Sequence, residues 1–330
     1  ERDLPVPMDD GVDLLTDRWV AAEHAAEAHP TGLVRTPYGR RQWVGLIFGR
    51  LLAERGFQVV VQSVRGSFGS GGEFAPFDER PDGLATLRWI REQAWHEGGI
   101  GTIGPSYLGL VQWAIADEVD AMAPSITASQ FRDMAMGSGA LGLDTAMSWL
   151  LLLNVQEAKA APLLMARGLR GLEDVWDHLP LGEIDERALG GPSPIWREWI
   201  EHMAPDSPYW DTRDFSSKVG DVEAPVQLVG GWQDMFLPWL VEDWHALRAK
   251  GRTPQLIIGP GAHVSPVLMS VGLREGMAWL RKHLLGDGRL VRDTPVRVWV
   301  GGEREWRDLE DWPPPGSREL KLHLQPGGGL

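Results

Sequence analysis

The sequence contains no cysteine among its 330 residues. Disulfide bridges, thiolate metal sites and cysteine nucleophiles are therefore excluded, so covalent catalysis would need another side chain. Positive charge is also scarce, with 32 basic residues against 46 acidic ones and a formal net charge of -14. This balance argues against a nucleic-acid partner, because phosphate binding needs a concentrated basic surface.

Long apolar runs are absent as well. No apolar run approaches the ~20 residues needed to cross a bilayer, so we expect no membrane span. The sequence opens at Glu1 with neither an initiator methionine nor a charged and then apolar leader, which leaves the natural N-terminus open. The expected location is cytoplasmic.

Patterns typical of metal or phosphate binding are missing too. There is no His-Glu-x-x-His, no close histidine pair and no calcium-loop pattern, so we expect neither a metal ion nor a cofactor. His24 and His29 lie in a polar, alanine-rich loop and are assigned to the surface. The glycine-rich stretch 65–74 lacks the Gly-Lys-Ser/Thr ending of a phosphate loop, so we interpret it as a flexible surface loop near a site.

What is present is typical of a folded globular protein, with 43% apolar and 24% charged residues. The length favours one large domain with insertions, or two domains. In the first half, short β-branched runs alternate with amphipathic stretches, which predicts a mostly parallel sheet flanked by helices and hence the α/β class. The predicted strands are 13–21, 31–35, 57–61 and 100–103, and the predicted helices are 41–55, 82–95 and 110–116.

The second half predicts an insertion and a change of architecture. Strand signals fade between about 133 and 217, which indicates an inserted helical cap, and they return at 225–229 and 255–258 around a helix at 240–250. Alternating runs at 296–300 and 320–324 resemble the opening strands of an all-β module, which either docks on the main body or lacks its remainder. The predicted division is a core in two parts (1–132 and 218–290), a cap (133–217) and the start of a β domain (291–330).

Tryptophan is abundant, with 17 residues, many of them between Trp149 and Trp244. We expect most of them to pack in the core and between domains. An aromatic-lined pocket for an apolar or aromatic ligand is the alternative interpretation.

Ser106 lies between a predicted strand and a predicted helix, in Gly104-Pro105-Ser106-Tyr107-Leu108-Gly109. A sharp strand-to-helix turn exposes a serine Oγ, and the free N–H groups of the following helix can stabilise an oxyanion. The Tyr107 amide is the best-placed donor. The strict elbow pattern has glycine two residues after the serine, whereas here Leu108 is at that position and Gly109 follows.

Asp234 and His263 each follow a predicted strand, in Gly230-Gly231-Trp232-Gln233-Asp234 and Gly259-Pro260-Gly261-Ala262-His263. Open α/β sheets place their ligand sites at the carboxyl ends of strands. The chain order of serine, acid and histidine is that of α/β-hydrolases. We therefore predict a catalytic triad of Ser106, Asp234 and His263.

These residues, together with Arg35-Thr36-Pro37-Tyr38-Gly39-Arg40, Gln62-Ser63-Val64-Arg65-Gly66 and Glu305-Trp306-Arg307-Asp308, resemble the cocaine esterase and X-Pro dipeptidyl-peptidase family, especially its cocaine-esterase-like branch. The resemblance implies an α/β-hydrolase fold, a helical cap and a C-terminal jelly roll, of which only the first strands are present. It implies Ser106 as nucleophile, His263 as general base and Asp234 as the orienting acid. It also implies that the Tyr38 hydroxyl joins the Tyr107 amide in the oxyanion hole. Gly261 and Ala262 depart from the tryptophan and hydroxyl residue common in the family.

The expected function is hydrolysis of a small-molecule carboxylic ester, or of an amide, through an acyl-enzyme on Ser106. One alternative is an X-Pro dipeptidyl-peptidase or another amide acylase, although no acidic pair for a peptide amino terminus is evident. Another is an inactive hydrolase-like binding or scaffold protein. The sequence leaves homo-oligomer formation open.

Overall fold

A ten-stranded sheet forms the centre of the computed structural model, which describes all residues except 137–140, 205, 324 and 326–330. The strand order is β1-β2-β4-β3-β5-β6-β7-β8-β9-β10. Strands β3 to β9 run parallel to one another, while β1 and β2 at one edge and β10 at the other are antiparallel to their neighbours. The strands are β1 Leu4–Pro7, β2 Asp13–Trp19, β3 His29–Thr36, β4 Gln58–Ser63, β5 His96–Pro105, β6 Ala121–Ser125, β7 Gln227–Gln233, β8 Gln255–Ala262, β9 Val296–Val300 and β10 Glu305–Leu309.

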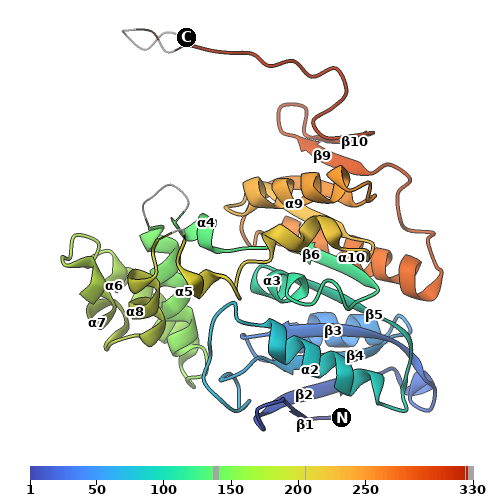
Figure 1. The fold of residues 1–330 in the computed structure, drawn as a ribbon, viewed down its shortest axis with the longest axis horizontal. Helices are drawn as coiled ribbons and strands as arrows, with labels where there is room; N and C mark the ends of the chain where they lie inside the picture. Colours follow the sequence, from blue (N-terminus) through green and yellow to red (C-terminus); the bar gives the residue numbers. More distant parts are fainter. Residues whose placement is uncertain (137–140, 205, 324, 326–330) are drawn as a thin grey trace.

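Helices cover both faces of the sheet (Figure 1). The core helices are α1 Arg50–Ala53, preceded by a π-helical turn at Gly45–Gly49, α2 Arg80–Arg91, α3 Tyr107–Trp113, α9 Leu237–Ala249 and α10 Pro266–Leu285. Between β6 and β7 the chain leaves the sheet and forms α4 Arg132–Met136, α5 Leu143–Val155, α6 Ala161–Leu172, α7 Ile184–Leu189 and α8 Pro194–Glu201. We call α4 to α8 the helical segment; Figure 1 shows it beside the sheet.

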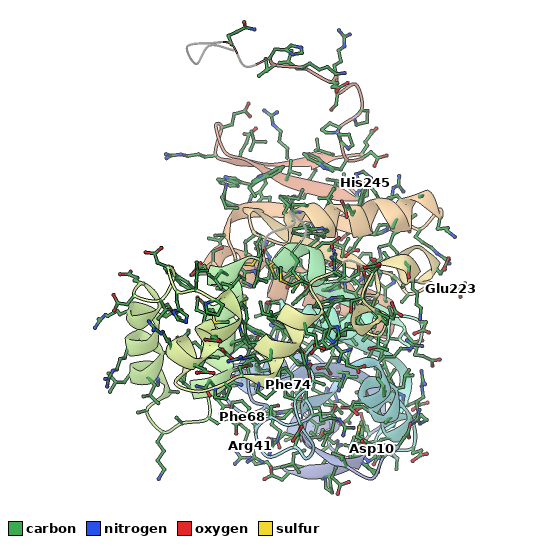
Figure 2. The ribbon with its side chains drawn as sticks, turned by 60° about the vertical axis from the view of Figure 1, so that its left-hand side comes forward. Asp10, Arg41, Phe68, Phe74, Glu223 and His245 are labelled. Atoms are coloured by element: carbon green, nitrogen blue, oxygen red, sulfur yellow. The ribbon has the colours of Figure 1, made fainter. Side chains whose placement is uncertain are left out.

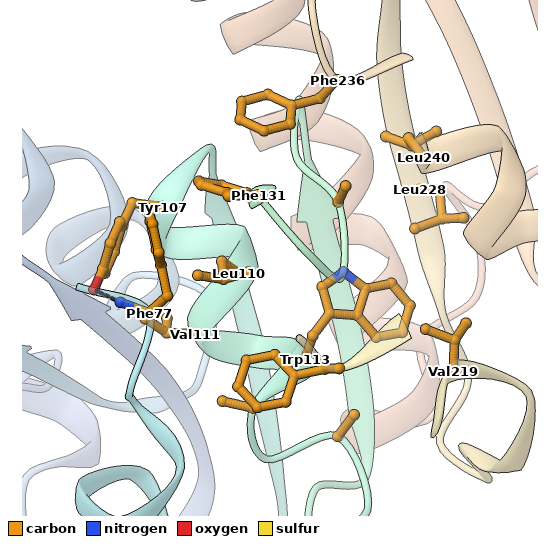
Figure 3. Close-up of a cluster of buried hydrophobic side chains, with 14 of the residues drawn as sticks. Phe77, Tyr107, Leu110, Val111, Trp113, Phe131, Val219, Leu228, Phe236 and Leu240 are labelled. Carbon is orange, nitrogen blue, oxygen red and sulfur yellow. Dashed lines mark hydrogen bonds between the residues drawn. The ribbon is translucent and has the colours of Figure 1, made fainter. Parts of the chain in front are cut away.

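The central strands are buried on both faces because alternate side chains point into two separate cores. Val60 of β4 packs with α2 and α3 residues such as Leu87 and Trp113, while its neighbours Val59 and Val61 pack with residues from α1 and α10. This period-two division explains the continuous apolar run in β4. Figure 3 shows the first core around α3, where Leu110 and Trp113 lie between Tyr107 and the side chains near β7.

The predicted α/β class and most central strands agree with the structure, but four elements were not predicted: β1, β6, α10 and β10. The longest helix, α10, contains Gly272 and Gly276, which weaken a helical pattern. Both glycines allow the helix to lie close to the sheet. A Cβ at Gly272 would lie 2.9 Å from Ser125 Oγ, and one at Gly276 would lie 2.8 Å from Ile103 Cδ1.

Of the two alternatives for the chain after residue 290, the structure shows docking on the main body. β9 pairs in parallel with β8, and β10 pairs with β9, so both belong to the main sheet. The second strand is 305–309 instead of the predicted 320–324; residues 320–323 form no strand, and 324 lies outside the described residues. Two strands cannot form a stable module alone, whereas docking on the open edge of β8 supplies partners for the backbone.

The loop 65–74 is more firmly held than a flexible surface loop would be. Ser70 is buried; its hydroxyl donates to the Ser63 carbonyl (2.8 Å) and accepts from the Leu15 N–H (2.9 Å). The Phe68 carbonyl accepts a 2.7 Å hydrogen bond from Arg40. Figure 2 shows Phe68 and Phe74 where this loop meets the helical segment. Among the described helices, none combines the length and apolar character that crossing a membrane requires.

Candidate active site

Ser106 lies at a sharp turn between β5 and α3. Its φ of 56° and ψ of -124° are unusual for a residue with a side chain, and such strain is characteristic of functional positions. The turn is held from both sides, because the Ser106 N–H donates to the Ser125 carbonyl (2.9 Å) and the Thr127 hydroxyl donates to the Ser106 carbonyl (2.8 Å). The serine side chain is thereby presented at the carboxyl end of β5.

Two positions near Ser106, Gly104 and Gly109, have no room for a side chain. Gly104 has a φ of 156°, and a Cβ there would lie 2.5 Å from the Cβ of Leu108. A Cβ at Gly109 would lie 2.3 Å from Thr127 Cγ2. Glycine is therefore needed three residues after the serine, where α3 passes the chain that leaves β6. This contact gives a physical reason for the departure from the strict elbow pattern.

The structure brings Ser106, His263 and Asp234 together. His263 Nε2 lies 3.0 Å from Ser106 Oγ, and His263 Nδ1 lies 3.2 Å from Asp234 Oδ1 and 3.4 Å from Oδ2. Asp234 and His263 follow β7 and β8, which are neighbours in the sheet. This arrangement is compatible with a relay in which a base contacts a nucleophile and an acid orients the base.

The side chains of Asp234 and His263 differ in their exposure to solvent. The Asp234 side chain is fully buried and also accepts the Phe236 N–H at 2.9 Å. The His263 side chain is 20% exposed and contacts the Phe236 ring, with centroids 5.4 Å apart. Gly261, before the histidine, has a φ of 113° and donates its N–H to Gln233 Oε1 (3.0 Å). That hydrogen bond anchors the loop despite the missing tryptophan.

Tyr107 contributes its backbone and its side chain in different ways. As the first residue of α3, it has an N–H that the helix leaves free, next to Ser106. Its hydroxyl points away into the protein, donating to Glu79 Oε1 (2.6 Å) and accepting from the Phe77 N–H (2.9 Å); Figure 3 shows the contact with Phe77. Burial, with the nearby Glu79 charge, raises the pKa of Tyr107 well above its usual range. Glu79 in turn pairs with buried Arg35 at 3.0 Å.

Tyr38 lies on the wall of the same cavity as Ser106 and His263. Its hydroxyl oxygen accepts a 2.8 Å hydrogen bond from the indole N–H of Trp149 in α5. Burial raises the pKa of Tyr38 to about 12, so its hydroxyl stays protonated and able to donate. Sequence reasoning missed the partner, Trp149, because no local pattern links residues 111 positions apart.

The cavity has a volume of about 840 Å³ and a mostly apolar wall. Phe77, Trp149 and Trp199 form one side; the Trp149 and Trp199 rings are stacked, with an interplanar angle of 4° and centroids 5.9 Å apart. Asp144 is the one carboxylate that we find among the described residues of the wall. The tryptophans thus serve both roles expected from the sequence. Trp149 and Trp199 line a pocket, whereas Trp113 and Trp244 are buried in the core.

The chain matches known proteins over most of its length. The family model described as X-Pro dipeptidyl-peptidase (S15 family) matches residues 10–265. Cocaine esterase from Rhodococcus sp. (strain MB1 Bresler) is 28% identical over 369 aligned positions, which cover 98% of this chain and 62% of the esterase. The chain therefore spans less than two thirds of that relative.

Solved structures share the fold. An aminopeptidase from a marine sediment Thaumarchaeota archaeon has a TM-score of 0.73 at 18% identity, covering 99% of this chain and 61% of its own. An α-amino acid ester hydrolase also has a TM-score of 0.73 at 18% identity, covering 95% and 58%. A CocE/NonD family hydrolase from Staphylococcus aureus has a TM-score of 0.65 at 18% identity, covering 96% and 56%.

Proposed function

Because the chain belongs to the X-Pro dipeptidyl-peptidase (S15) family, we propose that it is a serine hydrolase that cleaves a carboxylic ester through an acyl-enzyme on Ser106. The observation that carries this proposal is the 3.0 Å contact between His263 Nε2 and Ser106 Oγ at an apolar cavity. A serine hydroxyl is a weak nucleophile until such a base accepts its proton.

Acylation begins when Ser106 Oγ attacks the substrate carbonyl carbon and passes its proton to His263 Nε2. Asp234 holds the Nδ1–H tautomer and stabilises the imidazolium that forms. The Tyr107 N–H and the Tyr38 O–H donate to the oxyanion. When the tetrahedral intermediate collapses, the bond to the leaving group breaks and His263 protonates the alcohol. A water molecule then attacks the acyl-enzyme by the same route and releases the acid.

Trp149 has a part in this proposal because it orients the Tyr38 hydroxyl. An indole N–H can only donate, so the Tyr38 oxygen must be the acceptor in their hydrogen bond. The single Tyr38 proton is then directed away from Trp149, and the cavity that both residues line is the open direction. The accepted bond also makes the phenol a stronger donor.

The helical segment fits the role of a cap over this site. Cavity-lining residues come from α4, α5 and α6, including Met136, Trp149 and Ala161. We keep the proposed division into core (1–132 and 218–290) and cap (133–217), with β9 and β10 assigned to the core sheet. In this arrangement the cap encloses the acyl or alcohol group and excludes water from the oxyanion.

Esters are preferred to X-Pro peptides because of the charge on the cavity wall. A peptide amino terminus would need a strong acidic partner, and the described wall offers only Asp144, which is exposed and accepts a weak 3.4 Å hydrogen bond from Ser148. Aryl esters and proline anilides therefore discriminate between the two substrates. We expect kcat/KM to be at least tenfold higher for the ester; a preference for the anilide would favour the peptidase.

The direct test is labelling of the purified protein with a fluorophosphonate probe and mass mapping of the modified residue. We expect stoichiometric modification of Ser106 and none in Ser106→Ala. Ser148→Ala is the matched control, since Ser148 lines the same cavity without a histidine partner, and it should label like the wild type. A folded protein that does not label would favour an inactive binding protein instead.

A further inference from the structure

His24, Glu27 and His29 form a compact group far from the elbow in the sequence. His24 ends a short 3-10 helix, Glu27 lies in the turn that follows, and His29 is the first residue of β3. One donor atom from each side chain lies within 4.8 Å of the others. The two imidazole rings meet edge to face, with centroids 4.6 Å apart. The assignment of both histidines to the surface overlooked this contact.

The two imidazoles face the same carboxylate oxygen. His29 Nε2 lies 3.2 Å from Glu27 Oε2, and His24 Nδ1 lies 3.7 Å from that oxygen. The 3.7 Å separation is too long for a hydrogen bond. His24 Nδ1 is nevertheless buried and has no hydrogen-bond partner among the described residues. Burying a nitrogen without a hydrogen-bond partner costs free energy, and a cation bound between this nitrogen and the carboxylate would remove that cost.

The spacing fits a small metal ion. Tetrahedral Zn²⁺ binds imidazole nitrogen and carboxylate oxygen at about 2.0–2.2 Å, which places its donor atoms about 3.3 Å apart. The 3.2 Å between His29 Nε2 and Glu27 Oε2 already matches this value, whereas the 3.7 Å between His24 Nδ1 and the same oxygen would have to shorten. All three donor atoms lie within 4.8 Å of one another, so binding an ion requires the side chains to close on it. The Glu27 side chain is 65% exposed, so it is free to adjust, while the His24 and His29 side chains are 30% and 21% exposed.

We propose that His24, Glu27 and His29 bind one divalent transition-metal ion of the zinc class, with a fourth position open to water. Two imidazoles and one carboxylate are typical ligands of Zn²⁺, Co²⁺ and Ni²⁺. Calcium and magnesium are disfavoured because they require mostly oxygen ligands.

The position of the group indicates a stabilising role. His29 pairs with His96, and these residues begin β3 and β5, whereas the triad follows the carboxyl ends of its strands. The ion would tie the loop before β3 to the sheet. That loop is already attached there, since the Glu27 carbonyl accepts from Gln58 Nε2 at 3.0 Å and the His29 N–H donates to the Trp95 carbonyl at 3.1 Å.

The test uses the whole chain after treatment with a chelator. Titration with Co²⁺, followed by visible absorption, and with Zn²⁺, followed by calorimetry, should each give one saturable equivalent. We expect His24→Gln and His29→Gln to weaken Zn²⁺ binding at least tenfold each. The matched control is His245→Gln, because His245 is exposed in α9 (Figure 2) and is not one of the grouped residues; it should bind like the wild type.

Thermal unfolding gives a second readout. Excess Zn²⁺ should raise the Tm of the wild type and of His245→Gln, because an ion that binds only the folded state stabilises it, and it should raise that of His24→Gln by less. Circular dichroism of the metal-free variants checks that they fold. The proposal fails if the wild type shows no saturable equivalent, or if both His24→Gln and His29→Gln retain wild-type affinity. Labelling of Ser106 is independent of either outcome.

Discussion

The indole N–H of Trp149 donates a 2.8 Å hydrogen bond to the hydroxyl oxygen of Tyr38. This contact joins α5 of the helical segment to the loop after β3, and it fixes the direction of the one proton that Tyr38 can donate. Under the proposed mechanism, Tyr38→Phe removes an oxyanion donor and should lower kcat roughly 100-fold with little change in KM. Steady-state kinetics on an aryl ester measure both parameters, and an unchanged kcat would remove Tyr38 from the mechanism.

Trp149→Phe should lower kcat roughly tenfold, because Tyr38 stays in place but its proton is no longer directed into the cavity. If Trp149 acts through Tyr38, the double variant Tyr38→Phe/Trp149→Phe should be no slower than Tyr38→Phe alone. Measuring kcat for the four proteins of this cycle checks the coupling.

Trp199→Phe is the matched control for this cycle. Trp199 stacks on Trp149 and lines the same cavity, but its indole nitrogen has no hydrogen-bond partner among the described residues. Its loss should change KM more than kcat. Equal losses of kcat in Trp149→Phe and Trp199→Phe, or additive effects in the cycle, would mean that Trp149 acts only through packing.

Asp234→Asn should lower kcat roughly 10³- to 10⁴-fold while leaving the fold intact. The amide keeps the shape of the buried side chain, but it cannot stabilise the His263 imidazolium and favours the wrong tautomer. Burst kinetics with an aryl ester would separate acylation from deacylation, and both steps should slow because His263 serves in each. Wild-type turnover in Asp234→Asn would rule out this residue as the triad acid.

Asp243 of α9 gives the protein a pH-dependent stability. It is buried and accepts hydrogen bonds from the Ser129 N–H (2.9 Å) and hydroxyl (2.5 Å). Burial, aided by the Glu242 and Asp214 charges, raises the pKa of Asp243 to about 7. Between pH 4 and 7 the folded state therefore holds a proton that the unfolded chain has lost, and this contribution to stability falls as pH rises through that range.

Asp243→Asn tests this effect, since an asparagine can accept from the Ser129 N–H and donate to its hydroxyl oxygen. The free energy of unfolding of the variant, relative to the wild type, should increase by roughly 2–3 kcal/mol between pH 5 and pH 8. Urea unfolding at the two pH values measures this difference. A constant difference would mean that Asp243 keeps an ordinary pKa.

That Ser106, Asp234 and His263 lie close together could be predicted because each follows a strand whose buried, apolar pattern is visible in the sequence. Parallel strands end at one edge of the sheet, so Ser106, Asp234 and His263 had to converge there. The Trp149–Tyr38 hydrogen bond and the His24–Glu27–His29 group depend on how loops and helices pack, which no periodic pattern encodes. The edge strand β1 is only four residues long, which is too short for periodicity to reveal.

The walls of the apolar cavity should limit the size of the substrate. Ala161, the first residue of α6, lines the cavity, and an indole at this position would occupy space that a bulky acyl or alcohol group needs. Ala161→Trp should raise KM for a naphthyl ester roughly tenfold relative to that for a short acetate ester. Leu169→Trp is the control, because Leu169 lies on the same helix, is 43% exposed and is outside the cavity wall. If Ala161→Trp affected both esters equally, the substrate would have to bind elsewhere in the cavity, closer to Phe77 and Trp199 than to α6.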